Sequence, residues 1–316
     1  MKLLRIAIMG AAIIAAMVGI VVAGRHDESV AAKPAASATP HPVTLPATPG
    51  TYLGVYVAGV PGSYARVTEF QKISGVRPDV ILYYSGWLEP FSRTFASKTA
   101  KKGAVPLIQI EPKGINLTAI ASGKYDAYLS SYAEAVHAYK GPIILSFGHE
   151  MNGTWYSWGN KHTSPATFVA AWRHVVNLFR LADAANVTWL WTVNIIDNAT
   201  GIPSPGPWWP GSSYVTWVGI DGYYSTPTTT FAPLFGPTIV AVRALTDRPI
   251  LIAETGAANG ANQANQIDDL FSGVRIYGLL GLMWFDAIGK QDWRLSNPAS
   301  LFAFHQGGEA YPRLVP

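Results

Sequence analysis

Cysteine is absent from the chain, and charged residues are scarce. Without cysteine, disulfides, thiolate catalysis, cysteine-ligated zinc and an acylated lipoprotein anchor are all excluded. Charged residues make up 13% of the 316 residues, and the net charge is +4. Four basic and two acidic residues among the first 50 supply half of that excess, so no basic stripe is left to neutralise a phosphate backbone. We therefore expect no nucleic-acid partner.

Several common catalytic signatures are also missing. The sequence has neither a glycine-rich phosphate loop nor a Gly-x-Ser-x-Gly elbow, which argues against kinases and serine esterases. The pair His149 and Glu150 opens the zinc-protease pattern, but Gly153 occupies the position of its second histidine. We therefore expect no metal and no cofactor.

Hydrophobic residues, in contrast, make up 49% of the chain, which is enough for a large core. The aromatic residues include 11 Trp and 15 Tyr. Many of these belong in a core, but Trp and Tyr also combine a flat apolar face with a polar group. That combination suits the binding of sugar rings.

The first 50 residues carry a targeting pattern followed by a spacer. Residues 1–5 hold two positive charges, and residues 6–24 are uncharged and mostly apolar. This pattern is typical of a signal peptide or of an N-terminal membrane anchor, and the sequence leaves both open. Residues 25–50 are rich in Ala, Pro, Ser and Thr and predict a linker. Either interpretation places residues 51–316 outside the cytoplasm, secreted or tethered through residues 6–24 to the outer face of the membrane.

From Thr51 onward, short apolar runs alternate with longer stretches of helical period, which is typical of a parallel sheet. We expect eight strands, at residues 52–58, 79–85, 104–111, 142–147, 187–194, 215–222, 249–254 and 279–286. Eight strands joined by crossover helices predict an α/β fold, a closed (β/α)8 barrel that residues 51–316 form as a single, monomeric domain. The clearest helix spans residues 164–185, where Ser164 can cap the first turn and Pro165 suits the first helical position.

In such a barrel, functional groups gather at the carboxyl ends of the strands. Glu150 follows the predicted fourth strand and Glu254 ends the seventh, and only the barrel can bring two residues so distant in sequence together. Retaining glycosidases need two carboxyl groups roughly 5 to 5.5 Å apart, one to donate a proton and one to attack the anomeric carbon. Other side chains at strand ends are Ser85, Trp87, Glu111, His149, Asn194, Asp221, Tyr223, Trp284 and Asp286.

Two segments around the glutamates resemble glycoside hydrolase family 26. They are SFGHEMNGTWYSWG at residues 146–159 and PILIAETGA at residues 249–257. The His-Glu-Met-Asn-Gly-x-Trp core is specific, since related barrel glycosidases usually place Asn before the acid/base glutamate. The resemblance covers nearly all of residues 51–311, and it implies that Glu150 is the acid/base and Glu254 the nucleophile.

The resemblance also implies a set of substrate contacts. His149 would bind the sugar at the cleavage point, Tyr223 would donate to the nucleophile, and Trp155 and Trp284 would form aromatic walls. We expect three more substrate-binding residues, namely Asn152, Trp87 and Asp221. Glu111 and Asp286 fit either substrate hydroxyls or internal ion pairs. Trp208 and Trp209 lie in the connection after the predicted fifth strand. They could bind a sugar ring on their exposed faces or belong to a lid that packs against the barrel.

The implied substrate is a β-linked polysaccharide, and endo-β-1,4-mannanase is the commonest activity of the family. Typical mannanases carry a His near an earlier strand end and an Arg just after the last-strand Trp. This chain has no His between His41 and His137, and Phe285 follows Trp284. Mixed-linkage β-glucan and β-xylan are therefore alternative substrates. A non-catalytic, wall-associated carbohydrate-binding barrel is an alternative of another class, although the presence of both glutamates argues against it.

Overall fold

The computed structural model describes residues 45–311. The predicted targeting segment, residues 1–24, and most of the predicted linker, residues 25–50, lie outside the described residues. Within residues 45–311, no helix is both long and apolar enough to cross a membrane.

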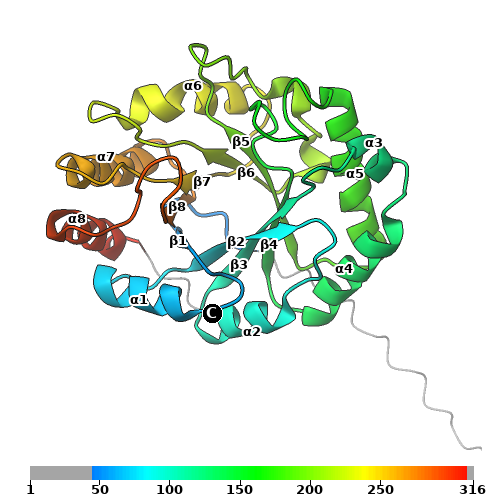
Figure 1. The fold of residues 1–316 in the computed structure, drawn as a ribbon, viewed down its shortest axis with the longest axis horizontal. Coiled ribbons are helices and arrows are strands. Elements are labelled where there is room, and N and C mark those ends of the chain that lie inside the picture. The colour runs from blue at the N-terminus through cyan, green and yellow to red at the C-terminus, as the bar shows by residue number, and fades with distance from the viewer. Residues whose placement is uncertain (1–44, 312–316) are drawn as a thin grey trace, which may run out of the picture. The chain divides into compact units, whose positions relative to one another are not determined.

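The strands form a closed parallel barrel in chain order, which confirms the predicted (β/α)8 fold (Figure 1). Each predicted strand is present, with bounds that shift by at most two residues. The strands are β1 (Tyr52–Val57), β2 (Val80–Gly86), β3 (Val105–Glu111), β4 (Ile143–Phe147), β5 (Val187–Asn194), β6 (Trp217–Asp221), β7 (Ile250–Thr255) and β8 (Gly281–Asp286).

Helices surround the strands, as Figure 1 shows. They are α1 (Ala65–Ser74), α2 (Arg93–Lys101), α3 (Leu117–Ala121), α4 (Asp126–Tyr139), α5 (Pro165–Leu181), α6 (Phe231–Arg243), α7 (Gln263–Ile276) and α8 (Pro298–Glu309), with 3-10 turns η1 (Gly206–Trp208) and η2 (Ser212–Tyr214). Helix α5 begins as predicted. The Ser164 hydroxyl accepts a hydrogen bond from the Thr167 backbone N–H at 3.1 Å, a cap that contributes about 1 kcal/mol.

Pairing of β1 with β8 closes the barrel, from Tyr52 opposite Gly281 to Val57 opposite Asp286. Gly281 has a φ of 152°, and a Cβ at this position would lie 1.8 Å from the Tyr52 carbonyl oxygen. Only glycine fits where the last strand meets the first.

Side chains alternate between two apolar layers, because successive residues of a strand point to opposite faces. The smaller layer fills the barrel and includes Leu82, Leu107 and Met283. The larger layer lies between strands and helices. The β5–β6 connection packs on this outer layer: Trp208 is buried, and the Trp209 ring lies 5.0 Å from that of Trp191. Of the two interpretations of this connection, the packed one is therefore correct.

The regular register is interrupted on both sides of β7, between Ile220 and Asp221 on β6 and between Ile252 and Thr255 on β7 itself. Such irregularities re-aim side chains at the rims of barrels. Here Ala253 belongs to the inner layer, yet its neighbour Glu254 also lines the cleft at the carboxyl end of the barrel. The interruption allows two consecutive side chains to turn inward.

Candidate active site

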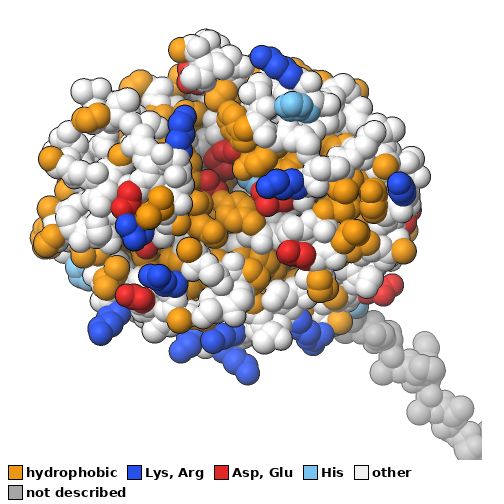
Figure 2. All heavy atoms as spheres, viewed as in Figure 1, with side chains coloured by type: hydrophobic (Ala, Val, Ile, Leu, Met, Phe, Trp, Pro, Cys, Tyr) orange, Lys and Arg blue, Asp and Glu red, His pale blue; other side chains and the backbone are white. Residues whose placement is uncertain are grey.

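A cleft of about 580 Å³ opens at the carboxyl ends of the strands, and both predicted glutamates line it. Figure 2 shows acidic side chains inside a hollow near the middle of this face, with hydrophobic side chains around them. Other residues of the cleft come from the ends of β5 and β8 and from the connections after β4, β5, β6 and β8, and include Trp155, Asn194, Tyr223, Phe285, Lys290 and Trp293.

Glu150 lies in a tight turn that follows β4. Its φ of 55° is a left-handed conformation that a residue other than glycine rarely adopts, and such strain concentrates at functional sites. The Glu150 backbone N–H donates to the Thr192 carbonyl oxygen on β5 at 2.9 Å. Its carboxyl oxygens accept two side-chain hydrogen bonds, from Asn194 Nδ2 at 2.5 Å and from Trp155 Nε1 at 2.7 Å. Both the backbone and the carboxyl group are thereby fixed.

Glu254 accepts hydrogen bonds from two phenols. The Tyr223 hydroxyl donates to Oε1, and the Tyr84 hydroxyl donates to Oε2. Tyr223 follows β6 and Tyr84 belongs to β2, so the two donors reach the carboxylate from opposite sides of the ring of strands. Each oxygen of Glu254 thus has its own donor.

Burial raises the pKa of both glutamates. Burial and the charge of Glu254 raise the pKa of Glu150 to about 8, although the bonds from Asn194 and Trp155 oppose the rise. Burial also raises the pKa of Glu254, and here the two phenol hydrogen bonds counteract it. A carboxyl group with a pKa near 8 can donate a proton at neutral pH, and a carboxylate that accepts two phenol hydrogen bonds can attack a carbon atom.

His149, the predicted sugar ligand beside Glu150, is buried, with 2% of its surface exposed. Its Nε2 lies 3.1 Å from the Tyr156 hydroxyl, and its Nδ1 has no hydrogen-bond partner among residues 45–311. Burial lowers the pKa of His149 to about 3, so the imidazole is neutral. The side chain can take part in hydrogen bonds but carries no charge.

Asn152 and Asp221 lie beneath the cleft, because both side chains are fully buried. Asn152 Nδ2 donates to the carbonyl oxygens of Asn194 at 2.9 Å and Pro203 at 3.2 Å, and its Oδ1 accepts from the Asn194 backbone N–H at 2.9 Å. This side chain therefore holds Asn194 in place, and none of its surface is exposed to the cleft. The carboxyl oxygens of Asp221 have no hydrogen-bond partner within the described part of the chain. Burial and the two glutamates raise its pKa well above the usual value, and it too has no surface to offer a sugar.

Trp87 and Trp284 both pack against other aromatic rings. The Trp87 ring packs edge-on against Tyr125 and Tyr128, beside α4, at 5.4 and 5.2 Å. Trp284 is fully buried and packs against Phe304 of α8 at 5.6 Å. Trp284 faces the helices because Met283, its neighbour on β8, fills the barrel interior.

The aromatic wall expected from Trp284 is supplied by Phe285 and Trp293. Phe285 follows the alternation of β8 and lines the cleft, and Trp293 joins it from the β8–α8 connection. The Tyr223 ring lies between them, 4.6 Å from Trp293 and 6.0 Å from Phe285.

Glu111 and Asp286 differ in their surroundings, and neither makes an ion pair among residues 45–311. The Glu111 carboxyl is half-buried at the end of β3, and its charge raises the pKa of Glu254. Asp286 accepts a hydrogen bond from the Leu295 backbone N–H at 2.8 Å and thereby fixes the β8–α8 connection.

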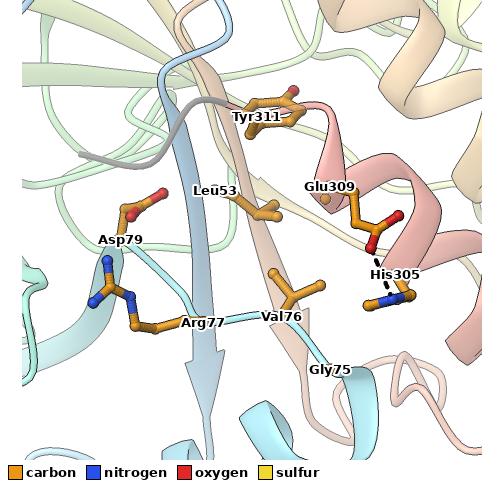
Figure 3. A pocket seen from close by; sticks show the side chains of 9 residues that line it. Leu53, Gly75, Val76, Arg77, Asp79, His305, Glu309 and Tyr311 are labelled. Atoms are coloured by element: carbon orange, nitrogen blue, oxygen red, sulfur yellow. Dashed lines mark ion pairs between the residues drawn. The ribbon is translucent and has the colours of Figure 1, made fainter. Parts of the chain in front are cut away.

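A second hollow, of about 410 Å³, lies at the amino ends of β1 and β2 (Figure 3). It is lined by Leu53, Gly75, Val76, Arg77, Asp79, His305, Gly308, Glu309 and Tyr311. His305 and Glu309 form an ion pair at 3.3 Å across one side of it. None of the predicted site residues reaches this end of the barrel, so the candidate active site is the cleft at the carboxyl end. Among residues 45–311, no group of His, Asp and Glu side chains is arranged to hold a metal ion.

Comparison with known proteins places the chain in a family. The model of glycosyl hydrolase family 26 matches residues 115–298. The chain is 31% identical over 274 residues to Endoglucanase H of Acetivibrio thermocellus. The match covers 81% of this chain and 30% of that protein. It is also 30% identical over 104 residues to a β-1,3-xylanase of a Vibrio species. That match covers 32% of this chain and 21% of the xylanase. The chain thus spans less than a third of the length of these relatives.

A solved structure, that of a modular endo-β-1,4-mannanase of Cellulomonas fimi, shares the fold with a TM-score of 0.65. It is 17% identical, and the match covers 84% of this chain and 72% of the mannanase. With a family model that matches more than half of its residues, the chain belongs to glycosyl hydrolase family 26 and is a glycoside hydrolase.

Proposed function

We propose that the enzyme cleaves β-linked polysaccharide with retention of configuration, Glu150 acting as acid/base and Glu254 as nucleophile. The observation that carries this assignment is the difference between the two carboxyl environments. Glu254 accepts a hydrogen bond at each oxygen from a phenol, which stabilises its ionised form. Glu150 has a pKa of about 8 and is protonated at neutral pH.

The reaction proceeds in two displacements. In the first, a Glu254 oxygen bonds to the anomeric carbon while the glycosidic C–O bond breaks, and the Glu150 proton passes to the departing oxygen. In the second, a water oxygen bonds to the anomeric carbon, the ester bond to Glu254 breaks, and the water proton passes to Glu150. Formation of the ester removes the charge on Glu254. Since that charge helps to raise the pKa of Glu150, the same residue becomes a base for the second step.

We expect kcat/KM to fall on the alkaline side with a midpoint near pH 8, because Glu150 must be protonated to act as the acid. The Asn194→Ala variant removes a donor to the charged form of Glu150 and should raise its pKa further. A series of kcat/KM values against pH should therefore show the alkaline limb at higher pH in this variant. A limb displaced to lower pH would be inconsistent with the Asn194–Glu150 contact.

Gly153 leaves room for the ring of Trp155. A Cβ at position 153 would lie 2.4 Å from ring atoms Cζ2 and Cη2 of Trp155, so Gly153→Ala must displace the ring from Glu150. We expect kcat/KM to fall about 10- to 100-fold, the usual effect of a misplaced catalytic group. Gly260→Ala is the matched control, because a Cβ there has no neighbour within 4 Å. Equal rates for both variants would show that the position of Trp155 is unimportant.

We further propose that the substrate is a β-glucan. Two observations support glucan over the mannan expected at first. The relative that covers most of this chain is named an endoglucanase, whereas the solved mannanase is only 17% identical and shows the fold alone. The chain also lacks the His and the Arg that the family resemblance associates with mannose contacts, and Phe285, which lines the cleft, occupies the position after Trp284.

Release of reducing sugar from barley β-glucan, mannan, glucomannan and xylan tests the substrate. The proposal predicts the highest kcat/KM on barley β-glucan. Release from mannan or xylan alone would contradict the glucan assignment and leave the cleavage chemistry intact. Binding to a polysaccharide without release from any of the four would contradict hydrolysis itself.

A further inference from the structure

Tyr84 is the closest side chain to the nucleophile that neither the sequence patterns nor the family motifs single out. Its hydroxyl donates to Glu254 Oε2 although the two residues are 170 positions apart in the chain. Strand β2 supplies Tyr84, and Tyr223, which donates to Oε1, follows β6, four strands away in the closed order. The two donors therefore reach Glu254 from opposite sides of the barrel.

We propose that Tyr84 is a second phenol donor to the nucleophile, which together with Tyr223 fixes the Glu254 carboxylate for attack and stabilises its charge. The proposal rests on the role of Glu254 given above. It assigns to Tyr84 a function in both steps of the reaction, since Glu254 is the attacking group in the first and the departing group in the second.

The ring of Tyr84 needs no hydroxyl for its packing. It lies edge-on to Tyr56 at 5.1 Å and 72°, and 5.6 Å from the imidazole of His149. A phenylalanine would keep these contacts. The hydroxyl, in contrast, has Glu254 as its partner, and burial together with the charge of Glu254 raises the pKa of Tyr84 well above its ordinary value. The phenol is therefore a permanent donor at any pH at which the enzyme works.

The surroundings of Glu254 make this donor necessary. Burial is the largest influence on its pKa and disfavours the ionised form, and the charge of Glu111 acts in the same direction. The hydrogen bonds from Tyr223 and Tyr84 are the influences that oppose this rise. The titratable or charged groups that face or border Glu254 are Tyr56, Tyr84, Glu111, Glu150, Tyr156, Asp221, Tyr223 and Lys290. Among residues 45–311, only the phenols of Tyr84 and Tyr223 donate to the Glu254 carboxyl group directly.

The two donors also fix the orientation of the carboxylate. One hydrogen bond would let the group rotate about the Cγ–Cδ bond, whereas a donor on each oxygen holds its plane. A donor that is present before the reaction costs no reorganisation when charge builds up again on Glu254 in the second step.

The test is the pH dependence of kcat/KM for Tyr84→Phe, with Tyr83→Phe as the matched control. Tyr83 precedes Tyr84 on β2, but its ring faces outward and packs against Phe95 of α2 at 5.4 Å. We expect Tyr84→Phe to lower kcat/KM about 10- to 100-fold, the usual effect of losing a hydrogen bond to a charged group. The acidic limb of its kcat/KM profile against pH should move to higher pH, because Glu254 loses a donor to its ionised form and its pKa therefore rises.

Tyr83→Phe should follow the wild-type profile, and both variants should show a wild-type melting temperature within a few degrees. An acidic limb that stays in place in Tyr84→Phe would overturn the proposal, even if the rate fell, because a merely structural role leaves this limb unchanged. Glu254→Gln separates this failure from failure of the proposed function. If that variant is inactive while the Tyr84→Phe limb is unmoved, only the role of Tyr84 is wrong; if it is active, the nucleophile itself is misassigned.

Discussion

Hydrolysis is expected to fall on the order of 10⁴-fold or more when Glu254 is replaced by Gln. The amide keeps the size of the side chain and remains within reach of Tyr84 and Tyr223, but it does not form the glycosyl ester. The fold should be unaffected, since the substitution removes a buried carboxyl group whose ionisation burial disfavours.

Initial rates of reducing-sugar release, with the melting temperature as a check on folding, measure this effect. Glu134→Gln is the matched control, because it makes the same substitution at an exposed position of α4. A folded Glu254→Gln variant that kept even a tenth of the wild-type rate would exclude Glu254 as the nucleophile.

Replacing Glu150 by Ala is expected to lower hydrolysis of the polysaccharide by about 10²- to 10⁴-fold, because a sugar departs poorly without a proton. The loss should depend on the leaving group. A strongly acidic phenol leaves an aryl glycoside without protonation. The first displacement on such a substrate should therefore keep its rate, and the glycosyl-enzyme should accumulate. Azide, which needs no general base, should then restore turnover by attacking that intermediate.

A burst of phenol release followed by slow turnover, accelerated by added azide, is the expected observation for this variant. The product of the accelerated reaction should be a glycosyl azide of β configuration. Equal losses on the polysaccharide and on the activated aryl glycoside, without any effect of azide, would show that Glu150 is not the acid/base.

The barrel could be predicted from the sequence because its signal is repeated. Eight apolar runs alternate with helical stretches, and each strand lies within two residues of its expected bounds. The two glutamates could be predicted because the carboxyl ends of parallel strands converge on one face. The prediction of the barrel and that of the two glutamates both depend on the order of strands and helices along the chain and not on how side chains pack.

The direction of each side chain was harder to predict, and β8 shows why. Trp284 was expected at the cleft. Successive side chains of a strand point alternately into the barrel and toward the helices, so the direction of one residue depends on which of its neighbours points inward. Met283 fills the barrel, so Trp284 points to α8 and Phe285 to the cleft. The same parity, with Val80 and Leu82 in the inner layer, would have identified Tyr84 as an inward residue.

The positions of Asn152 and Asp221 depend on contacts that sequence alone does not contain. Asn152 lies in the most specific motif of the chain, yet its amide binds the backbone of the β5–β6 connection, 42 and 51 residues away. Asp221 ends β6 at a register irregularity, which no local pattern indicated. The motif identified Asn152, and strand-end position identified Asp221, as polar residues of the site region, but neither signal showed that the side chain is buried.

The anomeric configuration of the first product distinguishes two displacements at the anomeric carbon from one. Hydrolysis of a β-linked polysaccharide in D₂O can be followed by proton NMR before mutarotation mixes the anomers. Two displacements, by Glu254 and then by water, predict that the new reducing end appears first as the β-anomer. If the α-anomer appears first, water attacks directly, and the account of Glu254 as a nucleophile is contradicted.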